Sequence, residues 1–279
     1  GQKQLLVATT SRVRIAKTVI SPEVNRVDDQ GIVHVNTRQS FRVVVEVKND
    51  GGQNLRDVRV GMLPSISSFI NGNERLIRSL PIGETSTVYF DMKADSVQNL
   101  IGETLSSFIK EAIGQDGSQA RVLPAMDSLA MAKIYNPAQL LIINTRNLTA
   151  STAQKVSFNQ PFAVEVVVKN LGSEPVENVS LLLTPDVVDG VTINKSTLAI
   201  PGIIAGDDTG KVVFSLTALP RVGRVNLTAG IVGSKGLNEG HAAAVQTAGQ
   251  VNSTFADIET NARLEILRVF TSVDRKSVV

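Results

Sequence analysis

The most constraining feature of this sequence is a stretch that occurs twice. Residues 41–64 recur as residues 162–185, at a constant offset of 121 residues. Each copy begins with a valine-rich run, passes through Lys-Asn-X-Gly and a polar segment, and ends in a second apolar run that stops at proline. Runs of β-branched residues joined by a turn rich in Asn and Gly are typical of paired antiparallel strands. The sequence therefore predicts the same β-hairpin in two places.

The repeat is too long for the units of a solenoid, which span about 20–50 residues, so each copy is predicted to be a whole domain. Residues 87–94 also recur, as 211–218, at an offset of 124. Each copy holds about seven short segments of strand composition, separated by turn signals, which is the pattern of a β-sandwich. The predicted fold class is all-β, with tandem immunoglobulin-like antiparallel β-sandwiches.

Three short apolar segments, 13–15, 140–142 and 264–266, occupy matching places after predicted linkers and set the expected boundaries. Residues 1–10 are predicted to be the end of a preceding repeat or a linker, 11–135 the first sandwich, and 136–260 the second. Residues 261–279 are predicted to be either the first strand of a truncated third repeat or an assembly strand. The second alternative predicts head-to-tail self-association by strand addition, because an exposed unpaired strand invites pairing with another chain.

One segment carries a mixed signal. Apolar residues between 100 and 113 recur at helical spacing. The counterpart at 222–233 alternates as a strand does and contains three glycines, which are poor helix formers. We therefore predict a strand at 104–113, with a short surface helix as the alternative.

Composition argues against several classes of function. The chain has no cysteine, which excludes disulfides, thiol nucleophiles and Cys-ligated metals. Its 28 basic and 26 acidic residues nearly cancel, and aromatic residues make up only 4%, so we expect no nucleic-acid partner. No apolar run approaches the roughly 18 residues that cross a bilayer, so we expect no membrane insertion by this segment. The first residues lack a signal-peptide pattern, so an export signal is expected outside this segment.

The two hairpins resemble a known family. The form Phe-X-Val-X-Val-X-Val-X-Asn-X-Gly, a polar segment and then Val-X-Val-X-Leu is similar to the bacterial and archaeal cell-adhesion-related (CARDB-like) domains, and to other immunoglobulin-like repeats of surface and secreted proteins. Residues 49–51 and 170–172 carry the Asn-X-Gly turn, and 174–179 match the following segment more closely than 53–58 do. The resemblance implies a seven-stranded sandwich, export and a stalk or adhesive role. It supplies no catalytic residues.

Histidines and acidic pairs are the candidate site residues, and each has a simple structural explanation. His34 and His241 stand in no nucleophile motif and no metal-spaced cluster. The pairs 28–29 (Asp28, Asp29) and 207–208 (Asp207, Asp208) lie in predicted turns, where carboxylates could hold calcium at a domain junction. Ordinary turn chemistry of aspartate is favoured, because the alternating ligand spacing of a calcium loop is absent.

Glu46 and Glu165 interrupt the valine runs. They are not equivalent in the repeat, so outward-facing strand positions explain them more simply than a pair of acid–base carboxylates. We predict no catalytic, cofactor-binding or metal-binding residues, and no cofactor. Five Asn-X-Ser/Thr sequons, to which we assign no function, begin at Asn147, Asn178, Asn194, Asn226 and Asn252.

These observations favour a non-enzymatic structural or adhesive segment, a stalk or spacer of a larger cell-surface or secreted protein. Its expected location is extracellular or at the cell surface, and its expected partners are neighbouring repeats of the same parent chain or surface assembly. One alternative is a carbohydrate- or ligand-binding accessory module of a secreted enzyme, although sugar sites generally need exposed aromatics and only Tyr89 and Tyr135 stand beside nine Phe residues. The other is a filament-forming surface subunit assembled by strand addition through its termini.

Overall fold

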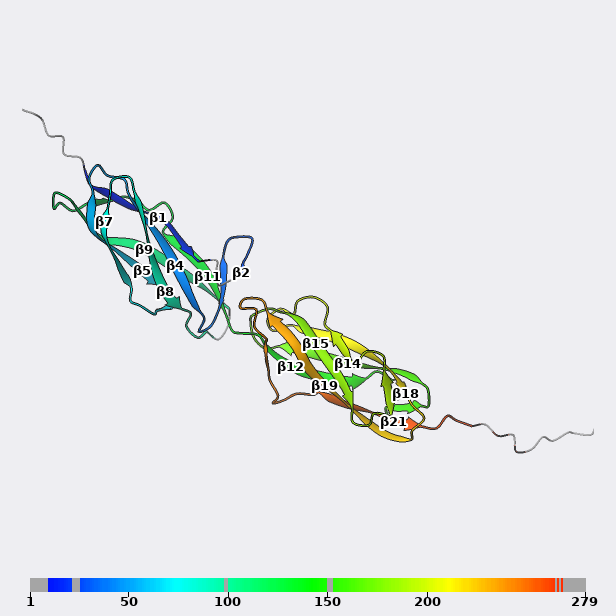
Figure 1. Ribbon diagram of the computed structural model, residues 1–279. Helices are drawn as coiled ribbons and strands as arrows, with labels where there is room; N and C mark the ends of the chain where they lie inside the picture. The colour runs from blue at the N-terminus through cyan, green and yellow to red at the C-terminus, as the bar shows by residue number, and fades with distance from the viewer. Residues whose placement is uncertain are drawn as a thin grey trace, which may run out of the picture.

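The computed structural model describes residues 10–21, 26–97, 100–149, 153–263, 265 and 267. These residues form strands and no helix, so the all-β prediction is confirmed for them, and they contain no helix that could span a membrane. The strands build four sheets, two in each of two successive β-units (Figure 1). We call these units the first unit, with β1 to β11, and the second unit, with β12 to β21.

Each unit is made of two sheets around one hydrophobic core. In spatial order, the first sheet of the first unit is β10 (Arg121–Val122), β1 (Arg12–Ile20), β4 (Ser40–Asn49), β8 (Thr85–Lys93) and β6 (Ser68–Phe69). Its second sheet is β2 (Arg26–Val27), β3 (Val33–Asn36), β11 (Leu129–Tyr135), β9 (Ile101–Gly114), β5 (Leu55–Pro64) and β7 (Glu74–Leu80).

The second unit repeats this plan with one strand fewer. Its first sheet is β16 (Val191–Ile193), β18 (Thr209–Ala218), β14 (Pro161–Asn170), β12 (Gln139–Asn147) and β20 (Ala244–Val245). Its second sheet is β13 (Lys155–Ser157), β21 (Ser253–Glu259), β19 (Gly223–Gly236), β15 (Val176–Pro185) and β17 (Thr197–Ala199).

The valine-rich runs form the central strands β4 and β14. Alternate side chains point into the core, and they include Val43, Val45 and Val47 in β4. This is the period of two that places every second residue on one face of a sheet. Burying each such side chain contributes about 1.5–3 kcal/mol. The core clusters separate along the chain, one ending at Ile134 and the other beginning at Ala138.

The segment with the mixed signal is a strand, as predicted, and a bulge explains its helical spacing. In β9, Ile109 pairs with Val60 and Glu111 pairs with Arg59, which leaves Lys110 as the extra residue. A bulge of this kind shifts the inward-facing positions by one. The buried Leu105 is therefore followed seven residues later by the buried Ala112, a spacing that also fits a helix.

Parallel pairs lie near one edge of each sheet, and the sequence did not reveal them. β1 pairs in parallel with β10 and β3 with β11, and the second unit repeats this with β12 and β20 and with β13 and β21. The other strand pairs are antiparallel among the described residues. The short strands of two to four residues that make these pairs carry too few residues for a period to be recognised.

The terminal segments are only partly covered by the structure. Residue 10 is described at one end, and residues 261–263, 265 and 267 at the other, none of them in a strand. The remaining residues of 1–10 and 261–279 lie outside the described part of the chain. The strand predicted within residues 261–279 and its role in assembly therefore remain a prediction.

The Asn of each Lys-Asn-X-Gly motif is buried, and its side chain hydrogen-bonds to several backbone segments of its unit. Asn170, which is fully buried, donates from Nδ2 to the carbonyl oxygens of Glu174 (2.7 Å) and Ala205 (3.3 Å). Its Oδ1 accepts the backbone N–H of Gly172 (3.1 Å) and of Gln139 (3.3 Å). One carboxamide thus provides hydrogen-bond partners for backbone groups of β12, of the turn after β14 and of the loop that contains Ala205.

Asn49 makes equivalent hydrogen bonds in the first unit. Asn49, also fully buried, donates from Nδ2 to the carbonyl oxygens of Gln53 (2.8 Å) and Leu80 (3.0 Å), and its Oδ1 accepts the N–H of Gly51 (2.9 Å). The glycine cannot be replaced cheaply, because a Cβ on Gly51 would lie 2.4 Å from the backbone nitrogen of Arg12. The recurring motif therefore encodes a buried polar anchor, and its glycine permits close approach of the first strand.

We expect Asn49→Ala to destabilise the first unit by about 2–4 kcal/mol, because two buried carbonyls and one buried N–H lose their partner at about 1–3 kcal/mol each. Chemical denaturation followed by tyrosine fluorescence measures this, because the chain has no Trp and both tyrosines lie in the first unit. Asn71→Ala is the control, because Asn71 is exposed and should change stability by less than about 0.5 kcal/mol. Equal effects of the two substitutions would contradict the proposed anchor.

Candidate functional site: the polar junction between the units

The two units meet through a buried cluster of polar side chains, which we call the junction cluster: Asn36, Glu174 and Asn238. Asn36 ends β3 of the first unit, whereas Glu174 and Asn238 come from the β14–β15 turn and the segment after β19 in the second unit. Their exposed fractions are 1%, 3% and 5%. Figure 1 shows the two units placed end to end, with the chain passing between them after β11.

Asn36 bridges the amide and the carboxylate of the second unit. Its Nδ2 donates to Glu174 Oε2 (3.0 Å), and its Oδ1 accepts from Asn238 Nδ2 (2.9 Å). A carboxamide suits this position because it is both donor and acceptor. The contact therefore joins the two units through two side-chain hydrogen bonds.

Glu174 is satisfied by hydrogen bonds to its carboxylate. Besides Asn36, its Oε2 accepts the backbone N–H of Ala138 (3.1 Å), and its Oε1 accepts that of Asn238 (2.8 Å). A buried carboxylate is costly unless such donors surround it. The side of Glu174 that faces Gly236 is tightly packed, because a Cβ on Gly236 would lie 2.6 Å from Glu174 Oε1.

The connecting peptide is held on both sides. The backbone N–H of Asn136 donates to Ser173 Oγ (2.7 Å), and the N–H of Glu174 donates to the carbonyl of Asn136 (2.9 Å). Gly172 permits this approach, because a Cβ there would lie 2.0 Å from the Pro137 carbonyl oxygen. The linker is consequently hydrogen-bonded to, and packed against, the turn between β14 and β15.

A stacked pair of rings supports the first unit's side of the junction. The rings of His34 and Tyr135 lie 5.2 Å apart at 18°, and both side chains are buried. His34 Nε2 lies 3.2 Å from Asp28 Oδ2, which also accepts from Lys133 Nζ (3.1 Å). Because Tyr135 precedes the linker directly, this stack positions the chain as it leaves β11.

Burial and hydrogen bonding shift the pKa values of this group. Burial lowers the pKa of His34, and the hydrogen bond to Asp28 opposes that shift. The N–H of Ile32, together with Lys133 and His34, holds the pKa of Asp28 well below its usual range. Burial raises the pKa of Tyr135. Near neutral pH the group therefore favours a neutral imidazole beside an ionised carboxylate.

The acidic turns make ordinary turn contacts. Asp28 Oδ1 accepts the N–H of Gln30 (3.0 Å) and of Ile32 (2.9 Å), and Asp208 Oδ1 accepts that of Thr209 (2.7 Å). Asp207 lies 3.9 Å from Lys169 Nζ and has a positive φ of 62°, which aspartate tolerates in turns. Within the described ranges, no three His, Cys, Asp or Glu side chains are grouped so that they could hold a metal ion.

The strand glutamates lie in different units. Glu46 is half-buried in β4, where it pairs with Lys17 and Thr87 of the neighbouring strands. Glu165 lies under two cations, 3.2 Å from Lys211 Nζ and 2.9 Å from Arg146 Nη2. The hydrogen bond from Lys211 is the main cause that lowers the pKa of Glu165. They are too far apart in the fold to act as one acid–base pair.

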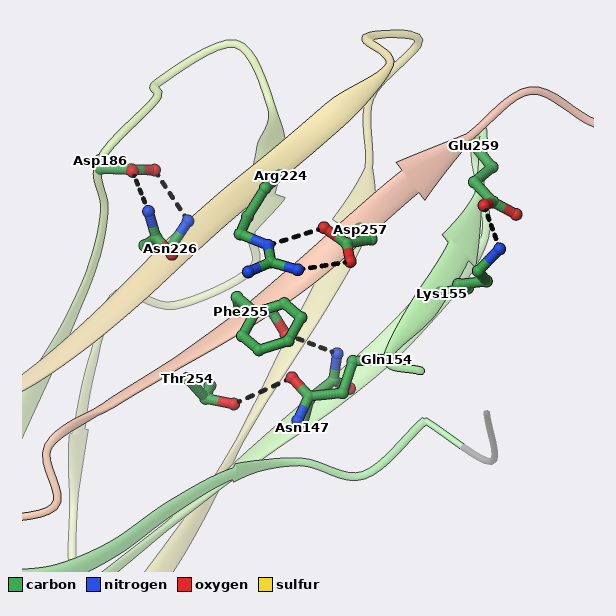
Figure 2. Close-up of polar contacts among 10 residues, drawn as sticks. All are labelled: Asn147, Gln154, Lys155, Asp186, Arg224, Asn226, Thr254, Phe255, Asp257 and Glu259. Atoms are coloured by element: carbon green, nitrogen blue, oxygen red, sulfur yellow. Dashed lines mark hydrogen bonds and ion pairs between the residues drawn. The ribbon is translucent and has the colours of Figure 1, made fainter. Parts of the chain in front are cut away.

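The far end of the second unit carries a ladder of paired polar side chains (Figure 2). Arg224 binds Asp257 through two contacts of 2.9 Å and lies 3.8 Å from the centroid of the Phe255 ring. Asp186 accepts from the backbone N–H and the Nδ2 of Asn226 (2.9 and 2.6 Å). Arg224 and Asp257 pair across β19 and β21, and Asn226 of β19 pairs with Asp186, which directly follows β15. Such pairs are typical of a stabilised sheet surface.

The remaining predicted residues lie away from the junction or at its rim. Tyr89 is exposed, with the Arg42 guanidinium 5.4 Å from the centre of its ring. His241 is exposed at the rim and lies 3.4 Å from Glu239. Sequence reasoning missed the junction cluster, whose members are more than 60 residues apart in the chain. The polar residues that differ between the two repeats at otherwise matching positions were the available signal.

Comparison with known proteins finds no family model and no curated protein that matches this chain. Among solved structures, a transglutaminase from red sea bream matches at 14% identity and a TM-score of 0.32, over 92% of this chain and 32% of that one. The adhesin InvE of Yersinia pseudotuberculosis matches at 14% identity and a TM-score of 0.27, over 87% and 58%. The chain therefore spans less than two thirds of either protein, and likenesses this low carry no inference about function.

We expect the first unit to lose stability on acidification below about pH 6.5. The unfolded state takes up a proton on His34 at its ordinary pKa of about 6.5, whereas the folded state takes it up only at a lower pH. Stability should therefore rise with pH between these two values. The test is denaturation followed by tyrosine fluorescence between pH 5 and 7.5, where His34→Gln should flatten the pH dependence and the exposed-site control His241→Gln should keep it.

Proposed function

We propose that this chain is a non-enzymatic spacer, a stalk segment of a larger cell-surface or secreted protein, built of immunoglobulin-like units that neighbour one another end to end. The observation that carries this proposal is the junction cluster, in which one carboxamide from the first unit bridges two side chains of the second. A spacer needs its domains held at a fixed distance and orientation, and this contact between the units supports such a role.

The physical argument concerns rotation about the linker. A free peptide between domains would let them rotate, because interfaces between domains are usually small and mobile. A rotation that moves Asn36 away from the second unit breaks its bonds to Glu174 Oε2 and Asn238 Nδ2, whereas Glu174 keeps its bonds to the N–H groups of Ala138 and Asn238. Each lost hydrogen bond contributes about 0.5–1.5 kcal/mol, so the aligned arrangement is favoured over a hinged one.

The chemistry of the described residues also supports a structural role. The carboxylates of Asp28, Glu165, Glu174 and Asp208 are bound to backbone N–H groups, to cations or to an amide. Catalytic acids and bases need to reach a substrate in a cleft. Asn36 and Glu174 of the junction cluster border a small pocket, but both carboxylate oxygens of Glu174 already accept hydrogen bonds. Turnover of a substrate by the purified chain in a hydrolase panel would contradict the non-enzymatic assignment.

We expect Asn36→Ala to loosen the junction without unfolding either unit. The cysteine-free chain can carry spin labels at Tyr89→Cys and Val213→Cys, two exposed and equivalent positions, one in each unit. The pulsed-EPR distance distribution between them should be narrow and should broaden with Asn36→Ala, which removes two hydrogen bonds worth about 0.5–1.5 kcal/mol each.

The matched control for this measurement is Ser157→Ala. Ser157 takes the place of Asn36 in the second unit, where it pairs with Glu259 as Asn36 pairs with Tyr135, and it takes no part in the junction. Its substitution should leave the distribution narrow. A broad distribution in the unsubstituted chain would show that the units are not held in a fixed relation, and the spacer proposal would fail.

The alternative of a carbohydrate-binding accessory module rests on exposed aromatic side chains. Tyr89 is half exposed, whereas Tyr135 is buried against His34 and cannot stack on a sugar face. Binding of this chain to a glycan panel, abolished by Tyr89→Ala, would favour the alternative. The filament alternative depends on residues 261–279, and removal of those residues followed by light scattering tests it.

A further inference from the structure

In the second unit, Asn36 is received by a socket that consists of Glu174, Gly236 and Asn238. The first unit carries an equivalent set of residues at the end that faces away from the junction. Strand register places Leu55 with Gly114 in the first unit where Val176 pairs with Gly236 in the second. Counting outward from these pairs, Gln53 takes the position of Glu174 and Asp116 takes that of Asn238. The two ends that face the chain's N-terminal direction are therefore built alike.

The close approaches at the two ends also match. A Cβ on Gly114 would lie 3.1 Å from Gln53 Oε1 and 2.9 Å from Asp116 Oδ1, just as one on Gly236 would meet Glu174. Asp50 donates its N–H to the carbonyl of Arg12, as Leu171 does to that of Gln139. The backbone frame that shapes the socket of the second unit is thus present in the first.

The amide and the acid have exchanged places between the two sockets. In the second unit the carboxylate belongs to Glu174 and the amide to Asn238, and Asn36 lies between them. In the first unit the amide belongs to Gln53 and the carboxylate to Asp116, and Gln53 Nε2 donates directly to Asp116 Oδ2 (3.1 Å). A carboxamide is both donor and acceptor, so it can bridge an amide and a carboxylate in either order.

A buried hydroxyl at the same place has no partner. Ser11 lines a groove with Gln53, Asp116 and Arg121 at this end of the first unit. Its side chain is only 6% exposed, and its Oγ has no hydrogen-bond partner among the described residues. Unpartnered buried polar groups are rare in folded proteins, and each calls for an explanation.

We propose that this end of the first unit, which we call the outer socket (Ser11, Gln53, Gly114 and Asp116), receives another β-unit of the same kind. The incoming unit presents an asparagine at the position of Asn36, whose carboxamide opens the Gln53–Asp116 bond and bridges the two groups. The inference rests on the proposed spacer function and extends it by naming the surface and the partner through which units stack.

The chemistry selects a unit like the first, rather than a second copy of this chain. The free end of the second unit carries Ser157 at the matching position, and a serine hydroxyl is too short to bridge the two groups. The end that bears Asn36 is covered by the chain's own second unit. The partner is therefore a further unit with a carboxamide at this place, and the chain alone should remain monomeric.

The experiment extends the full chain by one unit. A second copy of residues 11–137 is placed directly before Ser11, so that Pro137 of the added copy takes the position of Thr10. Spin labels at Tyr89→Cys in both copies report the new junction, and labels at Tyr89→Cys and Val213→Cys in the original chain report the internal one. If the outer socket works as proposed, both distance distributions are narrow and have the same centre.

Two sets of substitutions in the original copy test the residues themselves. Gln53→Ala should broaden the distribution across the new junction and leave the internal one narrow. The double substitution Q53E/D116N recreates the pair found in the second unit and should keep the new junction narrow. Thermal unfolding of each variant shows whether the first unit is still folded, so that a broad distribution is not mistaken for loss of structure.

The outcomes separate this inference from the spacer function. A broad distance distribution across the new junction, together with a narrow one across the internal junction, overturns the outer socket alone. A Gln53→Ala variant whose distribution across the new junction stays narrow does the same. A broad internal junction overturns the spacer function and the socket with it. The last experiment is sedimentation of the original chain at several concentrations. If the chain associates and Gln53→Ala abolishes the association, the outer socket binds a second copy of this chain, and the partner proposed here is wrong.

Discussion

The buried asparagine of the Lys-Asn-X-Gly motif is the contact on which the rest of the molecule depends. Asn170 holds the carbonyl of Glu174, so the residue that anchors the interior of the second unit also fixes the backbone of the residue that forms the junction. Asn49 holds the carbonyl of Gln53 in the same way. A single recurring side chain thus links the packing of each unit to the backbone of the residue at its end, Gln53 or Glu174.

Much of this fold could be predicted from the sequence, because the repeat and the two-residue period of the valine runs determine it. Val43, Val45 and Val47 alternate inward as expected, and the bulge at Lys110 accounts for the one segment whose period was misleading. The parallel pairs could not be foreseen, because strands such as β10 and β20 have two residues each. The junction could not be foreseen either, because no local pattern relates Asn36 to partners more than 130 residues away.

The junction illustrates how a buried charge contributes to specificity more than to stability. Removing Glu174 from water is costly, and well-packed apolar side chains could give an interface of equal or greater stability. An apolar interface would, however, tolerate many rotations, since apolar contacts are not directional. The carboxylate accepts only from donors placed at the right angle, namely Asn36 Nδ2 and the N–H groups of Ala138 and Asn238. Of these donors only Asn36 Nδ2 belongs to the first unit, so its hydrogen bond is the one that depends on how the two units are oriented.

The junction also sets the direction in which units can be added. The surface around Asn36 and the socket around Glu174 are different surfaces of a unit, so the contact is heterologous and leaves one free surface of each kind. A contact of that type does not close between two units, as a two-fold contact would, and it continues for as long as each free end has the required side chains. Ser157 lacks the carboxamide of Asn36, whereas Gln53 and Asp116 retain an amide and an acid. The two ends of this pair of units are consequently unequal, and the proposed contact could add a unit only at the end that bears Gln53 and Asp116.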